Sequence, residues 1–311
     1  MGPTASGKTA LAMQLANELA CEIISVDSAL VYKGLDIGSA KPSPQELEKV
    51  PHKLIDIREP CDPYSAADFR ADALEAIQHA LEKGRLPVLV GGTMLYFKAL
   101  VDGLAELPPA DKTIRATLAE DIKENGLHSL HRRLKNIDPL AAERIHENDS
   151  QRIQRALEVY EITGRNLTEL QEEGRILGGR GKCFEDLYEL RAIALAPQDR
   201  SILHQRIRIR FLKMVENGLL EEVKALHEKY GYNADLPAMR AVGYRQVWSF
   251  YSGELCYEEM VEKGIIATRQ LAKRQLTWLR AWKGLYWFEG DEENLLERAL
   301  SVLPLHRKNI S

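Results

Sequence analysis

The start of the chain shows two periods of apolar and polar residues, one helical and one extended. Three apolar positions recur every four residues, which predicts a helix with one apolar stripe: Leu11, Leu15 and Leu19. The run Glu22–Val26 that follows is short and rich in β-branched residues, and it predicts a strand that ends at Asp27.

The same alternation of helix and strand is repeated further along. Helical spacing extends over Ala66–Lys83, with Gly84 as the predicted stop. The apolar run Leu86–Val90 predicts a second strand, and Gly91–Thr93 follows it. Strands that alternate with helices indicate an α/β fold with a parallel sheet. In such sheets ligands bind beyond the carboxyl ends of the strands, where Asp27 and Thr93 fall.

The pattern changes near Leu107–Ala110, and this change predicts an inserted domain. Residues 111–186 are polar, charged and helical, and we expect them to end in a loose loop at Gly174–Gly181. Another core strand is predicted at Leu190–Leu195, and Asp199–Trp282 is mostly helical in pattern. The predicted organisation is therefore a core in two parts, residues 1–110 and 187–311, around a helical insertion, residues 111–186.

Composition narrows the class of protein. The 311 residues are 45% hydrophobic and 28% charged, which is typical of a globular protein with a sizeable core. The sequence has no run of about 18 apolar residues, so it predicts no membrane span, and its start lacks the layout of a secretory signal. The four cysteines form no C-x-x-C pair, which fits a reducing cytoplasm and gives no support for a zinc site. The net charge of −4 argues mildly against nucleic acid, so the local distribution of charge matters.

A phosphate-binding loop is the most specific motif. It matches G-x-x-x-x-G-K-[ST] with the residues Gly2, Pro3, Thr4, Ala5, Ser6, Gly7, Lys8 and Thr9. Glycines let backbone N–H groups point at phosphate oxygens, Lys8 adds a charge, and the Thr9 hydroxyl is suited to Mg²⁺. Such a loop normally follows a strand, whereas only Met1 precedes it. Either that strand is missing from this sequence, which we expect, or the sheet lacks its usual central member.

Two residues at the strand ends are candidates for chemistry, each with a plain structural alternative. Asp27 suits a general base or a magnesium ligand, but a turn or helix-cap aspartate explains it as well. Thr93 follows two glycines and can approach a phosphate closely, although threonine is also a common helix N-cap.

Two basic runs near the carboxyl end bear on the partner. Arg200–Lys213 and Arg269–Lys283 each hold five Lys or Arg residues and, after Arg200, no acidic one. Helical spacing puts Arg206, Arg210 and Lys213 on one face, and Arg269, Lys273 and Arg280 on another. Arg274 need not share the second face. With Trp278 and Trp282 nearby, these stripes suit RNA, although a solvated surface is the simpler interpretation of any one charge run.

Taken in order, the motifs resemble the bacterial tRNA dimethylallyltransferases over nearly the whole chain. The marks beyond the phosphate loop are 25-SVDSALVYK-33, 36-DIGSAKP-42, 90-VGGTMLY-96, 151-QRIQR-155, 242-VGYR-245 and 268-TRQLAKRQ-275. The resemblance implies a P-loop NTPase-like parallel sheet flanked by helices, with the helical insertion closing over a tRNA anticodon stem.

The resemblance also implies a reaction and its residues. A dimethylallyl group passes from dimethylallyl diphosphate to the exocyclic amine of the adenosine beside the anticodon, in tRNAs that read codons beginning with U. By position in the family motifs, Asp27 takes a proton from that amine, and Thr93 and Arg210 contact the diphosphate leaving group. The phosphate loop holds this diphosphate, with Mg²⁺ bound to Thr9. The expected partners are tRNA and the prenyl donor, and the expected form is a cytoplasmic monomer.

Contacts with tRNA are implied at five places. They are Asp27, Ser28, Ala29, Leu30 and Thr93; Arg115; Gln151, Arg152, Ile153, Gln154 and Arg155; Arg240, Ala241, Val242, Gly243, Tyr244 and Arg245; and Lys273, Arg274, Gln275, Leu276, Thr277, Trp278, Leu279 and Arg280.

Three other functions remain open on the residues alone. A small-molecule kinase explains the phosphate loop and Asp27 but not the basic helices. An adenylate prenyltransferase would use the same donor and leave the insertion without a role. A non-enzymatic tRNA-binding module would not need the phosphate loop.

Overall fold

A computed structural model describes residues 1–178, 184–231 and 236–303. The chain divides into two compact units, which are taken one at a time below. The first, the core unit, comprises Met1–Leu100 and Leu190–Ser311, and the second, the insertion unit, comprises Val101–Glu189. The segment expected as an insertion, residues 111–186, lies within the second unit.

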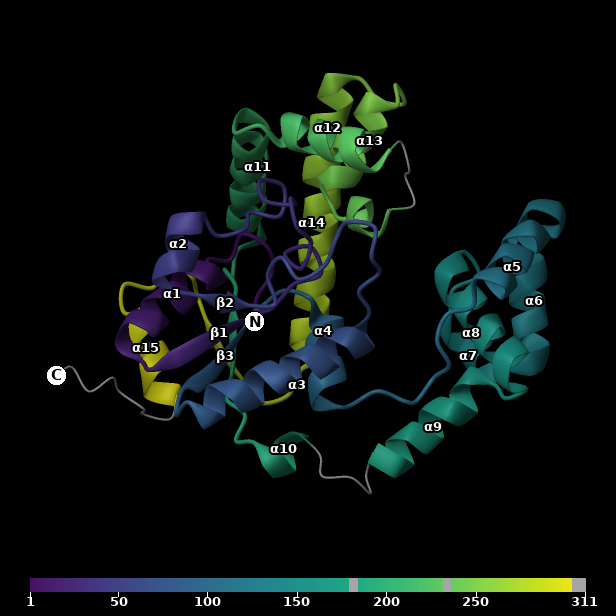
Figure 1. Cartoon of the computed structure of the whole chain (residues 1–311), viewed down its shortest axis with the longest axis horizontal. Coiled ribbons are helices and arrows are strands. Elements are labelled where there is room, and N and C mark those ends of the chain that lie inside the picture. The colour runs from purple at the N-terminus through teal and green to yellow at the C-terminus, as the bar shows by residue number, and fades with distance from the viewer. Residues whose placement is uncertain (179–183, 232–235, 304–311) are drawn as a thin grey trace. The chain divides into compact units, whose positions relative to one another are not determined.

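The core unit is built on two small parallel sheets (Figure 1). One has the order β2-β1-β3, with β1 at Cys21–Val26, β2 at His52–Lys53 and β3 at Leu86–Gly91. The other pairs β4, Ala192–Leu195, with β5, Leu285–Phe288. The predicted α/β fold and its three strands are confirmed; neither the two-residue β2 nor β5, with the sequence Leu-Tyr-Trp-Phe, had been predicted.

Met1 lies beside β4 in parallel register. Its amino group donates to Ile193 O at 2.7 Å, and Leu195 N donates to Met1 O at 2.9 Å. These two bonds attach the start of the phosphate loop to the second sheet.

Helices surround the sheets. They are α1 (Lys8–Glu18), α2 (Pro44–Lys49), α3 (Ala66–Glu82), α4 (Met94–Val101), α11 (Arg200–Glu216), α12 (Leu219–Tyr230), α13 (Tyr244–Tyr251), α14 (Tyr257–Ala281) and α15 (Leu295–Val302), with a 3₁₀ turn, η1, at Pro237–Arg240. The start of α3 shows why the pattern was readable: Ser65 accepts from Asp68 N in a capping box, and Gly84 follows the helix with φ 64°. The stripe of α1 is buried against β4, β5 and α15.

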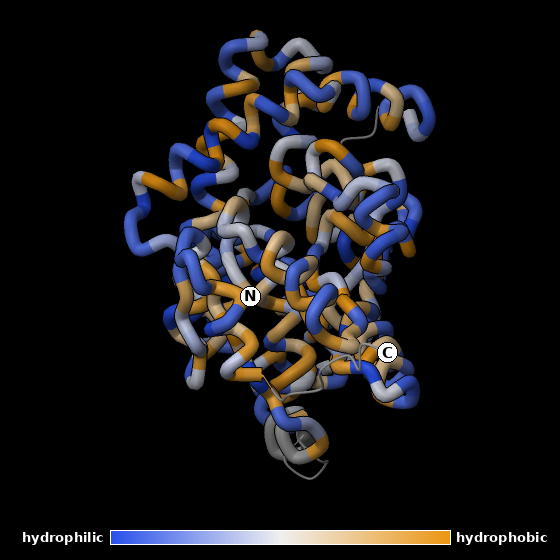
Figure 2. Tube along the Cα trace, turned by 90° about the vertical axis from the view of Figure 1, so that its left-hand side faces the viewer, coloured by the Kyte–Doolittle hydropathy of each residue, from blue (hydrophilic) through white to orange (hydrophobic). Residues whose placement is uncertain are grey.

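The insertion unit has its own helical core. Its helices are α5 (Lys112–Asn125), α6 (Leu127–Ile137), α7 (Pro139–Arg144), α8 (Ser150–Thr163), α9 (Leu167–Gly178) and α10 (Phe184–Leu187). Fully buried residues such as Leu130, Leu134, Ile153 and Leu157 fill the space between them. Along these and the core helices, hydrophobic and hydrophilic positions alternate within single turns (Figure 2), as expected when one face is buried.

One expected loop is partly helical. The segment Gly174–Gly181 was predicted to be loose, but α9 continues through Gly174 to Gly178, and the last three positions lie outside the described residues. A Cβ on Gly174 would stand 2.7 Å from Ala105 Cα, so glycine at this position of the helix permits close contact with the preceding linker.

Candidate functional site

The phosphate loop is tightly folded and leads into α1. Ser6 is fully buried, Gly7 has φ 90°, and Lys8 Nζ donates to Pro3 O at 3.3 Å. No side chain caps the start of α1, which leaves N–H groups of its first turn available to an anion. Thr9 is exposed in that turn. The loop therefore has the backbone geometry of a phosphate cradle.

Three charged side chains act on one another at this loop. Burial lowers the pKa of Lys8 to about 8, while the Asp27 carboxylate opposes that change and Arg210 adds to it. Burial also lowers the pKa of Arg210, again opposed by Asp27. Two cations are thus desolvated beside a single carboxylate, so both would gain from a further negative charge.

The ends of β1 and β3 bring Asp27 and Thr93 to the same edge of the sheet. Val26 pairs with Gly91, and Thr93 N donates to Val26 O at 3.2 Å. Ser28 N donates to Thr93 Oγ1 at 3.1 Å. The sheet rule therefore placed both candidate residues correctly.

Asp27 has a structural role that leaves part of it free. Its Oδ1 accepts from Ala29 N at 2.8 Å and from Leu30 N at 3.4 Å, which is the turn role that the sequence left open. Within the described part of the chain, Oδ2 accepts no hydrogen bond. One oxygen orients the carboxylate and the other is available to a ligand.

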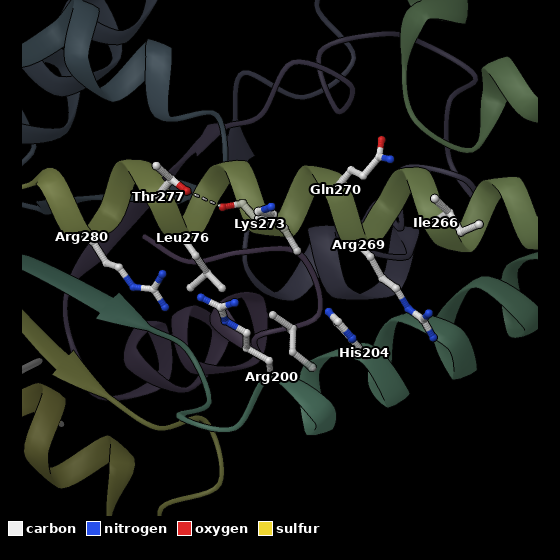
Figure 3. Close-up of a pocket in the computed structure, with 11 residues that line it drawn as sticks. Arg200, His204, Ile266, Arg269, Gln270, Lys273, Leu276, Thr277 and Arg280 are labelled. Carbon is white, nitrogen blue, oxygen red and sulfur yellow. Dashed lines mark hydrogen bonds between the residues drawn. The ribbon is translucent and has the colours of Figure 1, made fainter.

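A basic groove runs between α11 and α14 (Figure 3). Its volume is about 400 Å³, its lining has no Asp or Glu, and its cations are Arg200, Arg269, Lys273 and Arg280, with His204 beside them. The predicted shared face of Arg269, Lys273 and Arg280 is confirmed, and Arg274 does not line the groove.

The predicted stripe on α11 lies elsewhere. Arg206, Arg210 and Lys213 line a different pocket of about 630 Å³, formed with residues 36–44. The run itself holds no acidic residue, as noted above, but Arg206 pairs with Asp291 and the Nη1 of Arg208 lies 3.4 Å from Glu262. The partners come from distant segments, which a local count of charges cannot show.

Several residues expected at the RNA surface are buried instead. Their side chains pack inside the units: Ile153, Tyr244, Gln275, Leu276 and Leu279. Tyr244 donates to Glu222, and burial together with that contact raises the pKa of Tyr244. These side chains hold their helices in place, and an RNA contact at these positions stays a prediction. Exposed members of the set include Arg152, Arg245 and Trp278, for which an RNA contact stays a prediction.

Arg115 and Arg155 share a buried carboxylate that the sequence did not single out. Glu158 is fully buried and accepts from Arg115 Nε at 2.8 Å, Arg155 Nη1 at 2.7 Å and Asp111 N at 2.9 Å. Burial alone would raise the pKa of Glu158, but these hydrogen bonds lower it. The spacing from Arg155 to Glu158 is a helical i, i+3 pair and was a usable signal.

Comparison with known proteins decides the family. The family model described as IPP transferase matches residues 30–282. The chain belongs to the IPP transferase family.

Solved structures agree with this assignment along nearly the whole chain. A full-length tRNA isopentenylpyrophosphate transferase from Bacillus halodurans is 36% identical, with TM-score 0.68, over 96% of this chain and 92% of that one. A tRNA Δ2-isopentenylpyrophosphate transferase from Staphylococcus epidermidis is 31% identical, with TM-score 0.67, over 97% and 96%. A eukaryotic dimethylallyltransferase acting on tRNA is 27% identical, with TM-score 0.76, over 96% and 76%. The predicted family and fold class are confirmed.

Magnesium was expected at this family member's phosphate loop, and the donor set fits it. Mg²⁺ usually takes one or two protein oxygens and completes its shell with water and phosphate oxygens, so the exposed Thr9 hydroxyl suffices. Among the described residues, no three His, Cys, Asp or Glu side chains gather as a metal site.

Over the same ranges, no helix has the length and apolar character needed to cross a bilayer.

Proposed function

We propose that this transferase moves a dimethylallyl group from dimethylallyl diphosphate to the exocyclic amine of the adenosine beside the anticodon of a tRNA, and releases diphosphate. The observation that carries the proposal is the convergence of Lys8, Arg210 and Asp27 at the phosphate loop. We further propose that it acts as a monomer in the cytoplasm, on tRNAs that read codons beginning with U.

The two cations suit the leaving group. When the allylic C–O bond breaks, negative charge develops on the diphosphate oxygens, and Lys8, Arg210 and the amides at the start of α1 stabilise it. A bound Mg²⁺ would supply further neutralisation from the Thr9 side. Lys8 and Arg210 are already partly desolvated, so they need less reorganisation as charge builds.

Asp27 suits the acceptor. The adenine nitrogen forms a bond to the prenyl carbon, becomes cationic, and gives its extra proton to the free carboxylate oxygen of Asp27. Two backbone N–H groups orient that carboxylate through its other oxygen. To reach this site the base must leave its stack, which costs a few kcal/mol.

The basic groove and the exposed arginines suit RNA phosphates. Four cations without an acidic residue in a groove would release counterions on binding a polyanion. This feature favours tRNA over a free nucleotide as acceptor, because AMP would not reach past the catalytic residues.

The decisive experiment is nucleoside mass spectrometry of a tRNA transcript after incubation with the chain, Mg²⁺ and labelled dimethylallyl diphosphate. We expect one prenylated adenosine, and none when guanosine replaces the adenosine beside the anticodon. Prenylation of AMP but not tRNA would indicate the adenylate prenyltransferase instead. Transfer of the γ-phosphate of ATP to a small molecule would indicate the kinase.

A further inference from the structure

One buried side chain of α14 connects two loops of the core. Gln275 is 8% exposed, its Oε1 accepts from Thr4 N at 2.9 Å, and its Nε2 donates to Gly92 O at 2.8 Å. Thr4 belongs to the phosphate loop, and Gly92 precedes Thr93. The amide thus holds the phosphate cradle against the turn that carries a candidate catalytic residue.

The fit around this amide is specific to its neighbours. A Cβ on Gly92 would stand 2.3 Å from Gln275 Nε2, so only glycine lets the amide reach the backbone here. The amide must also accept on one atom and donate on the other, since Thr4 offers N–H and Gly92 offers C=O. Glutamine meets both requirements, whereas ionised glutamate can only accept.

We propose that Gln275 is a positioning residue for the donor site: it fixes the phosphate loop relative to Thr93 and thereby sets the affinity for diphosphate. This inference rests on the proposed function, because it takes the loop to bind the donor's diphosphate. It replaces the RNA contact that the resemblance implied for this residue, since the side chain is enclosed within the core unit.

The placement on α14 separates the two roles of that helix. Lys273 and Arg280 line the basic groove, whereas Gln275 does not. At 100° per residue, Lys273, two positions before Gln275, and Arg280, five positions after it, lie on the opposite side of the helix from Gln275. Loss of the amide should therefore weaken donor binding and leave RNA binding in place.

The test uses the full-length chain and Gln275→Met, which keeps length and volume but removes both hydrogen bonds. Titration calorimetry with inorganic diphosphate and Mg²⁺ measures donor-site affinity, and fluorescence anisotropy measures binding of a tRNA transcript. Two lost hydrogen bonds correspond to roughly a 5- to 100-fold weaker diphosphate affinity. We expect the tRNA dissociation constant to stay within about two-fold. Gln78→Met, on the exposed face of α3, is the matched control and should change neither constant.

A second variant gives a readout that a purely structural residue would not. In the Gln275→Glu variant, the side-chain carboxyl group can both donate and accept while it is protonated. Once ionised, it cannot donate to Gly92 O. The ratio of the variant's diphosphate affinity to that of wild type, measured at each pH, should approach one near pH 5. The ratio should fall as the pH rises and the carboxyl group ionises. This profile also keeps the inference testable if the Met variant does not fold.

The outcomes separate the two proposals. If wild-type protein binds no diphosphate, the proposed function fails. If wild type binds it and both Gln275 variants bind it equally at every pH, only the positioning role is wrong. Weaker tRNA binding with unchanged diphosphate affinity would restore Gln275 as an RNA contact.

Discussion

The two units each contain a compact charge centre, and the two centres are balanced differently. In the insertion unit, the Glu158 carboxylate is buried and satisfied by two guanidinium groups and a backbone N–H, which lower its pKa. In the core unit, burial lowers the pKa of Lys8 and of Arg210, and one carboxylate only partly offsets it. A charge centre whose charges are balanced by hydrogen bonds stabilises the fold. A centre with excess positive charge favours binding of an anionic ligand.

Replacing Asp27 with Asn should have the largest effect, and it tests whether Asp27 acts as the general base at the phosphate loop. The amide keeps the size of the carboxylate but cannot take the proton of the prenylated amine. We expect a roughly 10²- to 10⁴-fold slower chemical step, the usual range for a positioned base. Single-turnover prenyl transfer at saturating tRNA and donor measures it, with diphosphate binding as the control that should survive. A rate within a few-fold of wild type would leave Asp27 only its turn role.

Replacing Lys8 with Ala removes one of the two desolvated cations. We expect roughly 100-fold weaker binding of diphosphate, because a charge-assisted hydrogen bond in a water-poor loop is lost. Affinity for a tRNA transcript should be nearly unchanged. A variant that bound diphosphate normally and lost tRNA instead would move Lys8 out of the cradle.

Replacing Glu158 with Gln tests whether the insertion centre is structural. The change keeps the shape and leaves Arg115 and Arg155 without a counter-charge, which should cost about 2–4 kcal/mol of stability. Hydrogen exchange of α8 amides measures this locally. Glu161→Gln is the matched control on the same helix, since its pair with Arg133 is exposed and worth about 0.2–1 kcal/mol. Equal effects of the two changes would contradict the structural assignment.

The pH dependence of donor binding sharpens the comparison further. The pKa of Lys8 is lowered to about 8, so the side chain is charged below that pH and neutral above it. Diphosphate affinity of the free enzyme should therefore fall as the pH rises through about 8, by up to about ten-fold over one unit. Lys8→Arg keeps its charge in this range and corrects for ionisation of the ligand. Identical profiles for wild type and Lys8→Arg would show that Lys8 does not titrate there.

Sequence predicted the elements whose signals are local. A β-branched run predicted β1, an apolar run predicted β3, a glycine stop predicted the end of α3, and the rule for strand ends placed Asp27 and Thr93. β5 was missed because four aromatic and apolar residues are a short signal whose partner strand lies far away in the chain.

The side-chain contacts that sequence missed join segments far apart in the chain. Gln275 contacts residues 271 and 183 positions away, so nothing in its neighbourhood distinguishes it from an exposed helix residue. The same holds for Glu222, which accepts from the backbone of Asp36 and Ile37 at 3.0 and 2.7 Å. Spacing within a motif identifies which residues share a helix face, but burial depends on what the fold brings against that face.

The smallest effect is expected in the basic groove, where Arg200, Lys273 and Arg280 are exposed and share their charge with solvent. Lys273→Gln removes one cation from the groove lining without disturbing the buried face of α14. If that lysine contacts an RNA phosphate, tRNA affinity should fall about three-fold at moderate salt. The log–log slope of affinity against salt should become shallower by about 0.7–0.9, because one fewer counterion is released. Lys263→Gln, also exposed on α14 but outside the groove, is the matched control and should leave the slope unchanged. A titration of both variants between about 50 and 200 mM salt distinguishes them. Equal slopes for the two would make the groove a solvated surface, and RNA binding would then depend on the exposed arginines elsewhere in the chain.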